Sequence, residues 1–400
     1  MTANLKNESI SGFDASLWIN HAISPLVEHL KDDCTDLAII GPNLAFVDGR
    51  TGWRKVPFSL DMNALKSLAK TIAKNTNQSI SEQNPIMSAM LPNRERIQIV
   101  MPPAVASEQF SISVRRPSIN NFPVSSYVES GYFKNTAWKT GDGFGSDHQA
   151  FIEDAIQDDG VAGTELNGVK WSPSKNCLEK IKLKAKNDPL IGQAYELLST
   201  GRIADFLMFG IKQKFTMAMV GDTGSGKTAL MRSLCSLIPL EERLISIEDV
   251  RELFLPHDNF VNLMYSKGMQ GQADVSVSDL IANCMRMKPD RVLLAELRGS
   301  ESYDFLKLMT SGHAGSVTSY HAVNCASAIP RFVFMAKESK EAASYDMEIL
   351  RKLFLMSIDV IAHVKAVPLF NATGEMIGKK RVMTEIYWDP ILKEGLSFEH

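Results

Sequence analysis

One stretch of the sequence, GDTGSGKT at residues 221–228, constrains the fold more than any other. The apolar run FTMAMV precedes it and the helical pattern KTALMRSLCSL follows it. A glycine-rich loop between a buried strand and a helix is typical of a parallel α/β sheet. The alternation continues through RLISIED, SDLIANCMRMK, RVLLAE, SESYDFLKLMT and GSVTSYHA, which predict strand, helix, strand, helix and strand. We therefore expect an α/β fold with a mostly parallel sheet, finished by a hairpin built from SIDVIAHVKAVPLF and KRVMTEIYW.

This loop matches the phosphate-binding pattern G-x-x-x-x-G-K-[ST]. Glycines let successive backbone amides curl toward phosphate oxygens, and the helix that follows adds a favourable dipole. Lys227 supplies a positive charge for the β and γ phosphates, and Thr228 supplies a hydroxyl for Mg²⁺. The predicted nucleotide-binding residues are Gly221, Asp222, Thr223, Gly224, Ser225, Gly226, Lys227 and Thr228.

Hydrolysis of a bound nucleotide needs a carboxylate that organises water or metal. Two predicted strands end in acidic residues. Glu248, Asp249 and Glu252 follow one of them, and Glu296, beside Arg298, follows another. Ligands of open α/β sheets bind at these carboxyl ends of the strands. Helix capping and solvation explain either segment alone equally well, but both segments together with the phosphate loop favour a catalytic role.

The segment SGHAGSVTSYHA carries His313 and His321 in a polar, glycine-rich context. A single histidine is usually structural, but an imidazole N–H is also suited to sensing a γ-phosphate. A zinc site is the alternative, and no cysteine or carboxylate lies at a suitable spacing for it.

The rest of the chain predicts a division into domains. Residues 1–133 contain short alternating strands and two amphipathic helices, as expected for an α+β domain. Residues 134–187 are rich in Gly, Asp, Lys, Ser and Asn and predict a linker or insertion. Residues 188–400 form the α/β domain. The net charge of −3 argues against a dedicated duplex-DNA-binding protein, and the five scattered cysteines favour reduced thiols in the cytoplasm.

Taken together, the motifs resemble the secretion traffic ATPases, the type II/type IV secretion superfamily of hexameric RecA-like motors. That family has a phosphate loop, an "Asp box" (here SIEDVREL), a Walker B segment (LLAELRG) and a "His box" (GHAGSVTSYHA), in this order. LPNRERIQIVMPP and ISVRRPS resemble the branch of VirB-eleven-type ATPases of conjugation and type IV secretion. The resemblance implies a C-terminal RecA-like P-loop ATPase domain preceded by an α+β N-terminal domain.

The resemblance also implies roles for individual residues. Glu248 or Glu252 and Glu296 would share water activation and metal organisation, with Thr228 and Glu296 at the metal. His313 and His321 would sense the γ-phosphate or couple it to movement. The N-terminal arginines that would reach the nucleotide when the domains close are Arg96, Arg115 and Arg116.

The sequence departs from the family pattern at several positions. Asn93–Arg94 replaces the common Asp-Gly after Leu91–Pro92, which puts that tight turn in doubt. Ala295, Ala314 and Ser319 replace a frequent Gly, Pro and Thr. None of these changes removes a charged or donor group that the mechanism needs.

The function implied is a homohexameric, ATP-hydrolysing motor that uses Mg²⁺ and powers substrate transfer or pilus assembly in type IV secretion or conjugation. Its implied partners are the other cytoplasmic ATPases and the inner-membrane subunits of such a system, without a stable nucleic-acid complex. The implied location is the cytoplasm, peripherally at the inner face of the bacterial inner membrane. The alternatives are a motor for a type IV pilus or type II secretion, a RecA-type nucleic-acid motor and a non-hydrolysing scaffold gated by nucleotide.

Overall fold

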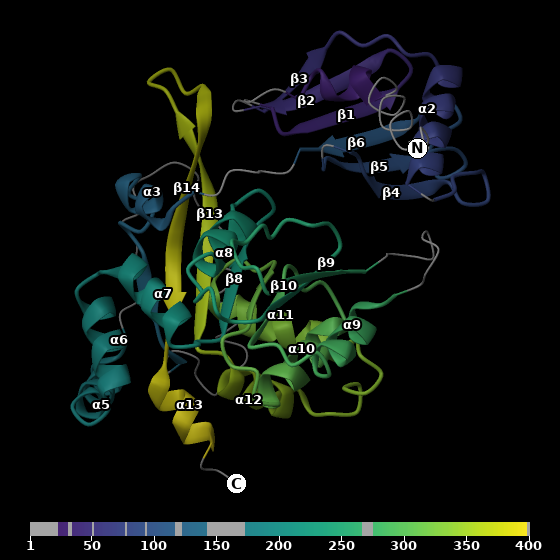
Figure 1. Ribbon diagram of the computed structural model, residues 1–400. Coiled ribbons are helices and arrows are strands. Elements are labelled where there is room, and N and C mark those ends of the chain that lie inside the picture. Colours follow the sequence, from purple (N-terminus) through teal and green to yellow (C-terminus); the bar gives the residue numbers. More distant parts are fainter. Residues whose placement is uncertain are drawn as a thin grey trace, which may run out of the picture. The chain divides into compact units, whose positions relative to one another are not determined.

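A computed structural model describes residues 23–30, 34–49, 52–76, 78–92, 94–116, 122–141, 173–265 and 275–397. The chain divides into two compact units (Figure 1). The first holds the residues up to 119, with which 266–275 and 369–378 are grouped, and the second holds the remainder. The predicted boundaries at 133 and 187 stay a prediction, and residues 142–172 of the predicted linker lie outside the described part.

The first unit is built on a six-stranded sheet in the order β3-β2-β1-β6-β5-β4. Every strand pair is antiparallel. One face of this sheet packs its alternating apolar side chains with those of helix α2. The helix begins after Asp61, whose carboxylate accepts a hydrogen bond from the Ala64 amide at 2.8 Å. The bounds are β1 (Asp36–Gly41), β2 (Leu44–Gly49), β3 (Gly52–Val56), α2 (Met62–Asn75), β4 (Ile86–Met90), β5 (Arg96–Val100) and β6 (Ser111–Arg115).

The second unit is built on an eight-stranded sheet in the order β10-β9-β11-β12-β8-β13-β14-β7. The strands from β10 to β13 are parallel to one another. The turn 371–375 joins β13 to β14 as the predicted hairpin, and β7 lies parallel beside β14. The bounds are β7 (Ala137–Lys139), β8 (Met217–Gly221), β9 (Leu244–Glu248), β10 (Phe260–Met264), β11 (Arg291–Leu294), β12 (Val317–Tyr320), β13 (Val360–Phe370) and β14 (Met376–Tyr387).

Helices cover both faces of this sheet. Met217 and Met219 of the central strand β8 join one core, and Ala218 and Val220 join the other. The first core includes α5–α8 and the second includes α9–α12, and Figure 1 shows these two groups apart. The bounds are α3 (Val124–Glu129), α5 (Lys175–Ala185), α6 (Pro189–Ser199), α7 (Ile203–Lys212), α8 (Lys227–Cys235), α9 (Val277–Cys284), α10 (Glu301–Thr310), α11 (Cys325–Lys337), α12 (Met347–Ser357) and α13 (Pro390–Ser397).

The architecture places the predicted loop at the carboxyl end of a central parallel strand, where β8 ends and α8 begins. The predicted fold class, a mostly parallel α/β domain preceded by an α+β domain, is confirmed. Among the described helices, none combines the length and apolar character needed to cross a bilayer.

Candidate nucleotide-binding site

Glycine is required by the backbone of the loop between β8 and α8. Gly224 and Gly226 have φ angles of 77° and 97°, in the left-handed region that favours glycine. A Cβ atom on Gly221 would lie 2.1 Å from the carbonyl oxygen of Val364 on the neighbouring strand β13. The loop is therefore curled and packed tightly against the sheet, as phosphate binding by backbone amides demands.

The side chain of Lys227 is buried inside this curl, with only 7 % of its surface exposed. Its Nζ donates hydrogen bonds to the carbonyl oxygens of Gly221, at 2.7 Å, and Asp222, at 2.8 Å. Burial lowers the pKa of Lys227 to about 8, against the opposing charges of Glu296 and Asp222. An anionic ligand beside this ammonium group would favour its charged form.

Ser225 gives an independent sign of a ligand. Its side chain is fully buried, and its hydroxyl has no hydrogen-bond partner within the part of the chain described here. A buried hydroxyl without a partner costs roughly 1–3 kcal/mol. A phosphate oxygen would satisfy it, so the donor set of the loop fits a nucleotide.

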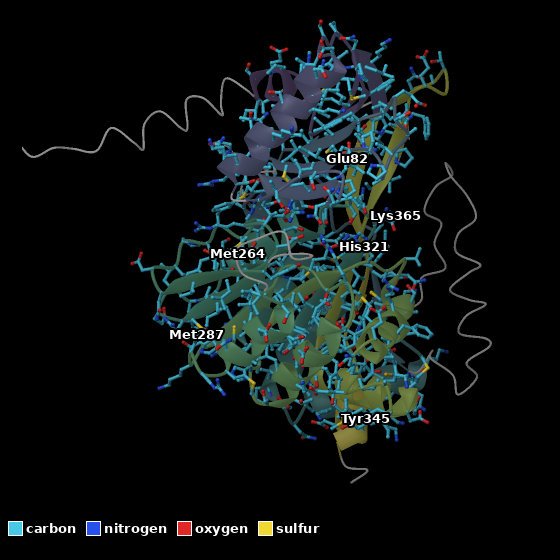
Figure 2. The ribbon with its side chains drawn as sticks, turned by 90° about the vertical axis from the view of Figure 1, so that its right-hand side faces the viewer. Glu82, Met264, Met287, His321, Tyr345 and Lys365 are labelled. Carbon is cyan, nitrogen blue, oxygen red and sulfur yellow. The ribbon has the colours of Figure 1, made fainter. Side chains whose placement is uncertain are left out.

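Lys227, Glu296 and His321 come together at the carboxyl ends of β8, β11 and β12. His321, labelled in Figure 2, lies just after β12, with Nδ1 3.5 Å from Lys227 Nζ and Nε2 3.1 Å from Glu296 Oε1. An ammonium group can only donate, so Nδ1 acts as the acceptor, and Nε2 carries the proton that it donates to Glu296. In this tautomer, His321 links Lys227 of the phosphate loop to the carboxylate of Glu296 through two contacts.

Arg298 ties Glu296 to the carboxylate that follows the next strand. Its Nε donates to Glu296 Oε2 at 2.8 Å, Nη2 contacts the same oxygen, and Nη1 donates to Asp249 Oδ2 at 3.1 Å. The forked guanidinium thereby holds the acidic groups after β11 and β9 side by side. The sequence signal for Arg298 was its position two residues after Glu296.

Glu248 has a different environment from Glu296. It is buried, and its carboxylate accepts hydrogen bonds from the Ser246 hydroxyl at 2.7 Å, the Glu252 and Leu253 amides at 2.7 and 2.9 Å, and the Asn262 amide group at 3.1 Å. Burial raises the pKa of Glu248, and these hydrogen bonds oppose the rise. All of its contacts lie within the structure around β9, where it fixes the turn that follows the strand.

Glu252 lies within that turn and is half-buried. Its amide donates to Glu248, and its carbonyl oxygen accepts a hydrogen bond from Arg232 Nη1 at 3.3 Å. The negative charge of Glu252 also opposes the lowering of the Arg232 pKa that burial causes. Glu252 is thus associated with α8, the helix that follows the phosphate loop.

His313 is not brought to Lys227. It lies between α10 and β12, where Ser316 Oγ donates to its carbonyl oxygen and Ser311 Oγ lies 3.3 Å from Nδ1. The strand β12 separates it from His321, and its four residues span about 13 Å. The two histidines therefore lie at opposite ends of the parallel strands, His313 at the amino ends and His321 at the carboxyl ends.

The three N-terminal arginines belong to the first unit. Arg96 and Arg115 are directly opposite each other on β5 and β6, and Asp36 on β1 is opposite Arg115. Arg115 Nε donates to Asp36 Oδ1 at 2.6 Å, and Arg116 Nη1 donates to the Leu30 carbonyl oxygen at 3.3 Å. The sheet register thus gathers the positive charges of Arg96 and Arg115 on one face.

Sequence reasoning missed two residues of this region. Asn262, on the edge strand β10, supports Glu248, and nothing in its short segment marked it. Arg381, on β14, donates from Nε to the Gly224 carbonyl oxygen of the phosphate loop at 3.2 Å. The signal for Arg381 was the basic run Lys379–Lys380–Arg381, which we interpreted only as part of a hairpin.

Within the described ranges, no group of three or more His, Cys, Asp and Glu side chains is arranged to hold a metal ion alone. A magnesium ion that shares its ligands with phosphate oxygens and a hydroxyl does not require such a group. The half-buried Thr228 and Glu296 are the available donors beside the loop.

Comparison with known proteins agrees with this geometry. Residues 195–368 match the family model "Type II/IV secretion system protein". The chain is 33% identical over 388 residues to "Type IV secretion system protein VirB11" of Brucella suis, covering 96% of this chain and 93% of the relative. It is 31% identical to "Protein VirB11" of Agrobacterium tumefaciens, with 88% and 92% covered.

A solved structure titled "Crystal Structure of the Pilus Retraction Motor PilT and Bound ADP" superposes with a TM-score of 0.51 at 12% identity, covering 93% of this chain and 86% of that one. This likeness concerns the fold alone. The identity to the VirB11 proteins over nearly the full length, together with the phosphate loop and its acidic partners, shows that the chain belongs to the type II/IV secretion ATPase family as a VirB11-like type IV secretion ATPase.

Proposed function

We propose that this chain works as a homohexameric motor that hydrolyses ATP with Mg²⁺ to power substrate transfer or pilus assembly in type IV secretion. The observation that carries the proposal is the convergence of Lys227, His321 and Glu296 on the phosphate loop. Bound Mg²⁺ would neutralise charge on the β and γ phosphates. Thr228 and Glu296 are proposed to hold it.

We assign the acidic residues different roles. Glu296 is proposed to orient the attacking water, because it is linked through His321 to the lysine that faces the terminal phosphates. Glu248 is proposed as a positioning residue, because four hydrogen bonds already occupy its buried carboxylate. Glu252 is proposed to support the same turn. His321 is proposed to sense the γ-phosphate, since a phosphate near Lys227 changes the charge that Nδ1 faces.

The proposed roles of His313, Arg96, Arg115 and Arg116 depend on a neighbouring subunit or on closure of the two units. His313 precedes the amino end of β12, away from the phosphate loop, and is proposed to act across a subunit contact. The arginine pair on β5 and β6 is proposed to reach nucleotide when the units close. We also propose that the partners of the chain are the other ATPases and the inner-membrane subunits of a type IV secretion system, and that the chain lies at the cytoplasmic face of the inner membrane.

A phosphate-release assay on the full chain tests the enzymatic part. We expect Lys227→Ala to abolish nucleotide binding, and Glu296→Gln to retain ATP binding but lower kcat by about 100-fold or more. Glu348→Gln makes the same chemical change in the first turn of α12, outside the proposed site, and serves as the control. Equal kcat for Glu296→Gln and wild type would overturn the assignment of Glu296.

Two further measurements test the motor. Sedimentation of the ATP-bound chain should give a mass of six subunits, and a monomer at micromolar concentration would contradict the ring. Single-stranded DNA should leave the rate of hydrolysis unchanged. A strong stimulation with a steep salt dependence would instead support a nucleic-acid motor.

A further inference from the structure

We propose that Arg381 is a nucleotide-binding residue that pairs with the α-phosphate, on the side of the phosphate loop opposite Glu296. The inference rests on the proposed function and names a contact of the same site. Its starting point is a bond across the sheet, from Arg381 Nε on β14 to the carbonyl oxygen of Gly224 at the tip of the loop, at 3.2 Å.

The stem of Arg381 also packs on the loop. A Cβ atom on Gly226 would lie only 3.0 Å from Arg381 Cδ, so the absence of a side chain at this position leaves space for the arginine. Gly226 is the last residue before α8, whose first amides face the phosphates in a loop of this kind. Arg381 is therefore held at the mouth of the loop by two separate contacts.

The strand order decides which end of the nucleotide Arg381 would meet. Around the central strand β8, the neighbour on one side is β12 and the neighbour on the other is β13, followed by β14. His321 and Glu296 follow β12 and β11, so the terminal phosphate belongs on that side. A triphosphate that lies across the start of α8 extends toward β13 and β14, where Arg381 stands.

The charge of Arg381 is available for a phosphate. Across the described ranges, Arg381 has no carboxylate within ion-pair distance, and its two terminal nitrogens have no hydrogen-bond partner. Its positive charge opposes the rise in pKa that burial causes at Tyr127 and Tyr132, in and just after α3. Two terminal nitrogens of a planar fork match two oxygens of a phosphate.

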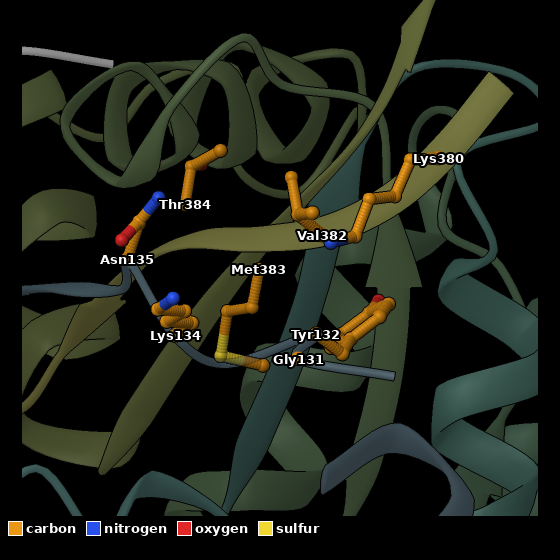
Figure 3. Close-up of a pocket in the computed structure, with 8 residues that line it drawn as sticks. All are labelled: Gly131, Tyr132, Lys134, Asn135, Lys380, Val382, Met383 and Thr384. Atoms are coloured by element: carbon orange, nitrogen blue, oxygen red, sulfur yellow. The ribbon is translucent and has the colours of Figure 1, made fainter. Parts of the chain in front are cut away.

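Neighbouring side chains alternate between the two faces of β14 and provide a control. Lys380 lines a small pocket with Val382 and Thr384, which follow it on the same face of the strand, and Figure 3 labels all three. This pocket measures about 60 Å³, which holds a few water molecules but no nucleotide base. Lys380→Gln thus removes one positive charge next to Arg381 without touching the proposed contact.

Binding of ATP and ADP to the full chain, measured by calorimetry, tests the inference. We expect Arg381→Gln to weaken ATP and ADP by the same factor, about tenfold or more, because both nucleotides carry the α-phosphate. Arg381→Lys should recover only part of the loss. Lys380→Gln should bind both nucleotides within about twofold of wild type.

A sulfur-substituted nucleotide locates the contact. Wild type should discriminate between the two stereoisomers of α-thio-ATP, and Arg381→Gln should lose this discrimination. Weakened ATP with unchanged ADP would place the contact at the γ-phosphate and overturn the inference, as would wild-type affinity for both nucleotides. If wild type itself binds no nucleotide, the proposed function fails as well, so the two failures are distinguishable.

Discussion

At the scale of single residues, burial of the charged Lys227 side chain lowers the stability of the fold. The charged ammonium is buried in a loop of backbone carbonyl groups, and desolvation lowers its pKa to about 8 from an ordinary value of 10.5. A depressed lysine pKa means that the folded chain binds the proton less tightly than the unfolded chain. Between about pH 8 and 10.5 the unfolded state therefore holds more protons, and the stability of the fold rises with pH in that window.

Lys227→Met should reveal this cost. We expect the free energy of unfolding of wild type minus that of Lys227→Met to increase with pH from about 8 to 10.5, by about 3 kcal/mol in total. Urea unfolding at several pH values measures it, with the exposed Lys212→Met as a control for general pH effects. A difference that is constant across this window would contradict the buried, destabilised charge.

A second residue, Arg94, carries backbone strain. Its φ angle is 72°, in the left-handed region, and the family pattern places a glycine here. The turn is formed all the same, since the Arg94 amide donates to the Leu91 carbonyl and the Leu91 amide to the Glu95 carbonyl, both at 2.8 Å. The turn between β4 and β5 therefore closes, with strain in the backbone at Arg94, although the sequence departs from the family pattern here.

Arg94→Gly should relieve the strain and stabilise the first unit by about 1 kcal/mol. Arg94→Ala keeps the Cβ atom and should give no such gain, which separates strain from loss of the arginine side chain. Calorimetric melting of the full chain measures both variants. Equal melting temperatures for the glycine and alanine variants would refute the explanation.

At the scale of elements, the sequence predicted the strands with clear turn or motif boundaries and missed those without them. A chemical motif follows each of the strands β8, β9, β11 and β12. The sequence therefore indicated both that these segments are strands and where they end. β10 was missed because it is a five-residue edge strand without buried alternation. The helices α6 and α7 were not predicted, although Gly201, whose φ angle is 74°, marks the break between them in the way typical of a helix C-terminus.

The same limit applies to the site. Motif spacing identified Lys227, Glu296 and His321, because each residue stands at the end of a parallel strand or its loop. The different environments of Glu248 and Glu296 could not be predicted. They depend on how the turn after β9 folds back and on Asn262 from β10, which are tertiary contacts.

We therefore expect the turn after β9 to depend on the hydrogen bonds of Glu248. Glu248→Ala removes the acceptor of four hydrogen bonds and should lower the free energy of unfolding of the second unit by about 3 kcal/mol. Glu248→Gln keeps one acceptor oxygen and should lose less. Tryptophan fluorescence, to which the buried Trp388 of this unit contributes, follows the urea transition. Glu252→Ala, in the same turn, should have the smaller effect, and the reverse order would contradict the positioning role.

At the scale of the whole molecule, the two units have separate cores. Among the residues that the structure describes, those that form the core of the first unit lie between Ile23 and Val114. Val124 and Tyr132, which lie inside the predicted N-terminal domain of residues 1–133, pack in a core of the second unit. The carbonyl oxygen of Tyr132 accepts a hydrogen bond from the Met383 amide at 2.9 Å, and Thr136 Oγ1 donates to the Met383 carbonyl oxygen at 3.0 Å. A fragment that ends near 119 thus keeps a complete core, whereas one that ends at 133 carries apolar residues away from their partners.

Two fragments, 1–119 and 1–133, should therefore behave differently. We expect 1–119 to fold alone with a cooperative thermal transition, because the described residues of its sheet and α2 bury an apolar face against one another. The longer fragment should melt at the same temperature but expose Val124, Tyr127 and Tyr132, and should bind more of a hydrophobic dye. Circular dichroism and dye fluorescence measure the two properties on equal concentrations. If 1–119 shows no cooperative transition while 1–133 does, residues 120–133 belong to the fold of the first unit, and the separation of the two cores does not define independent domains.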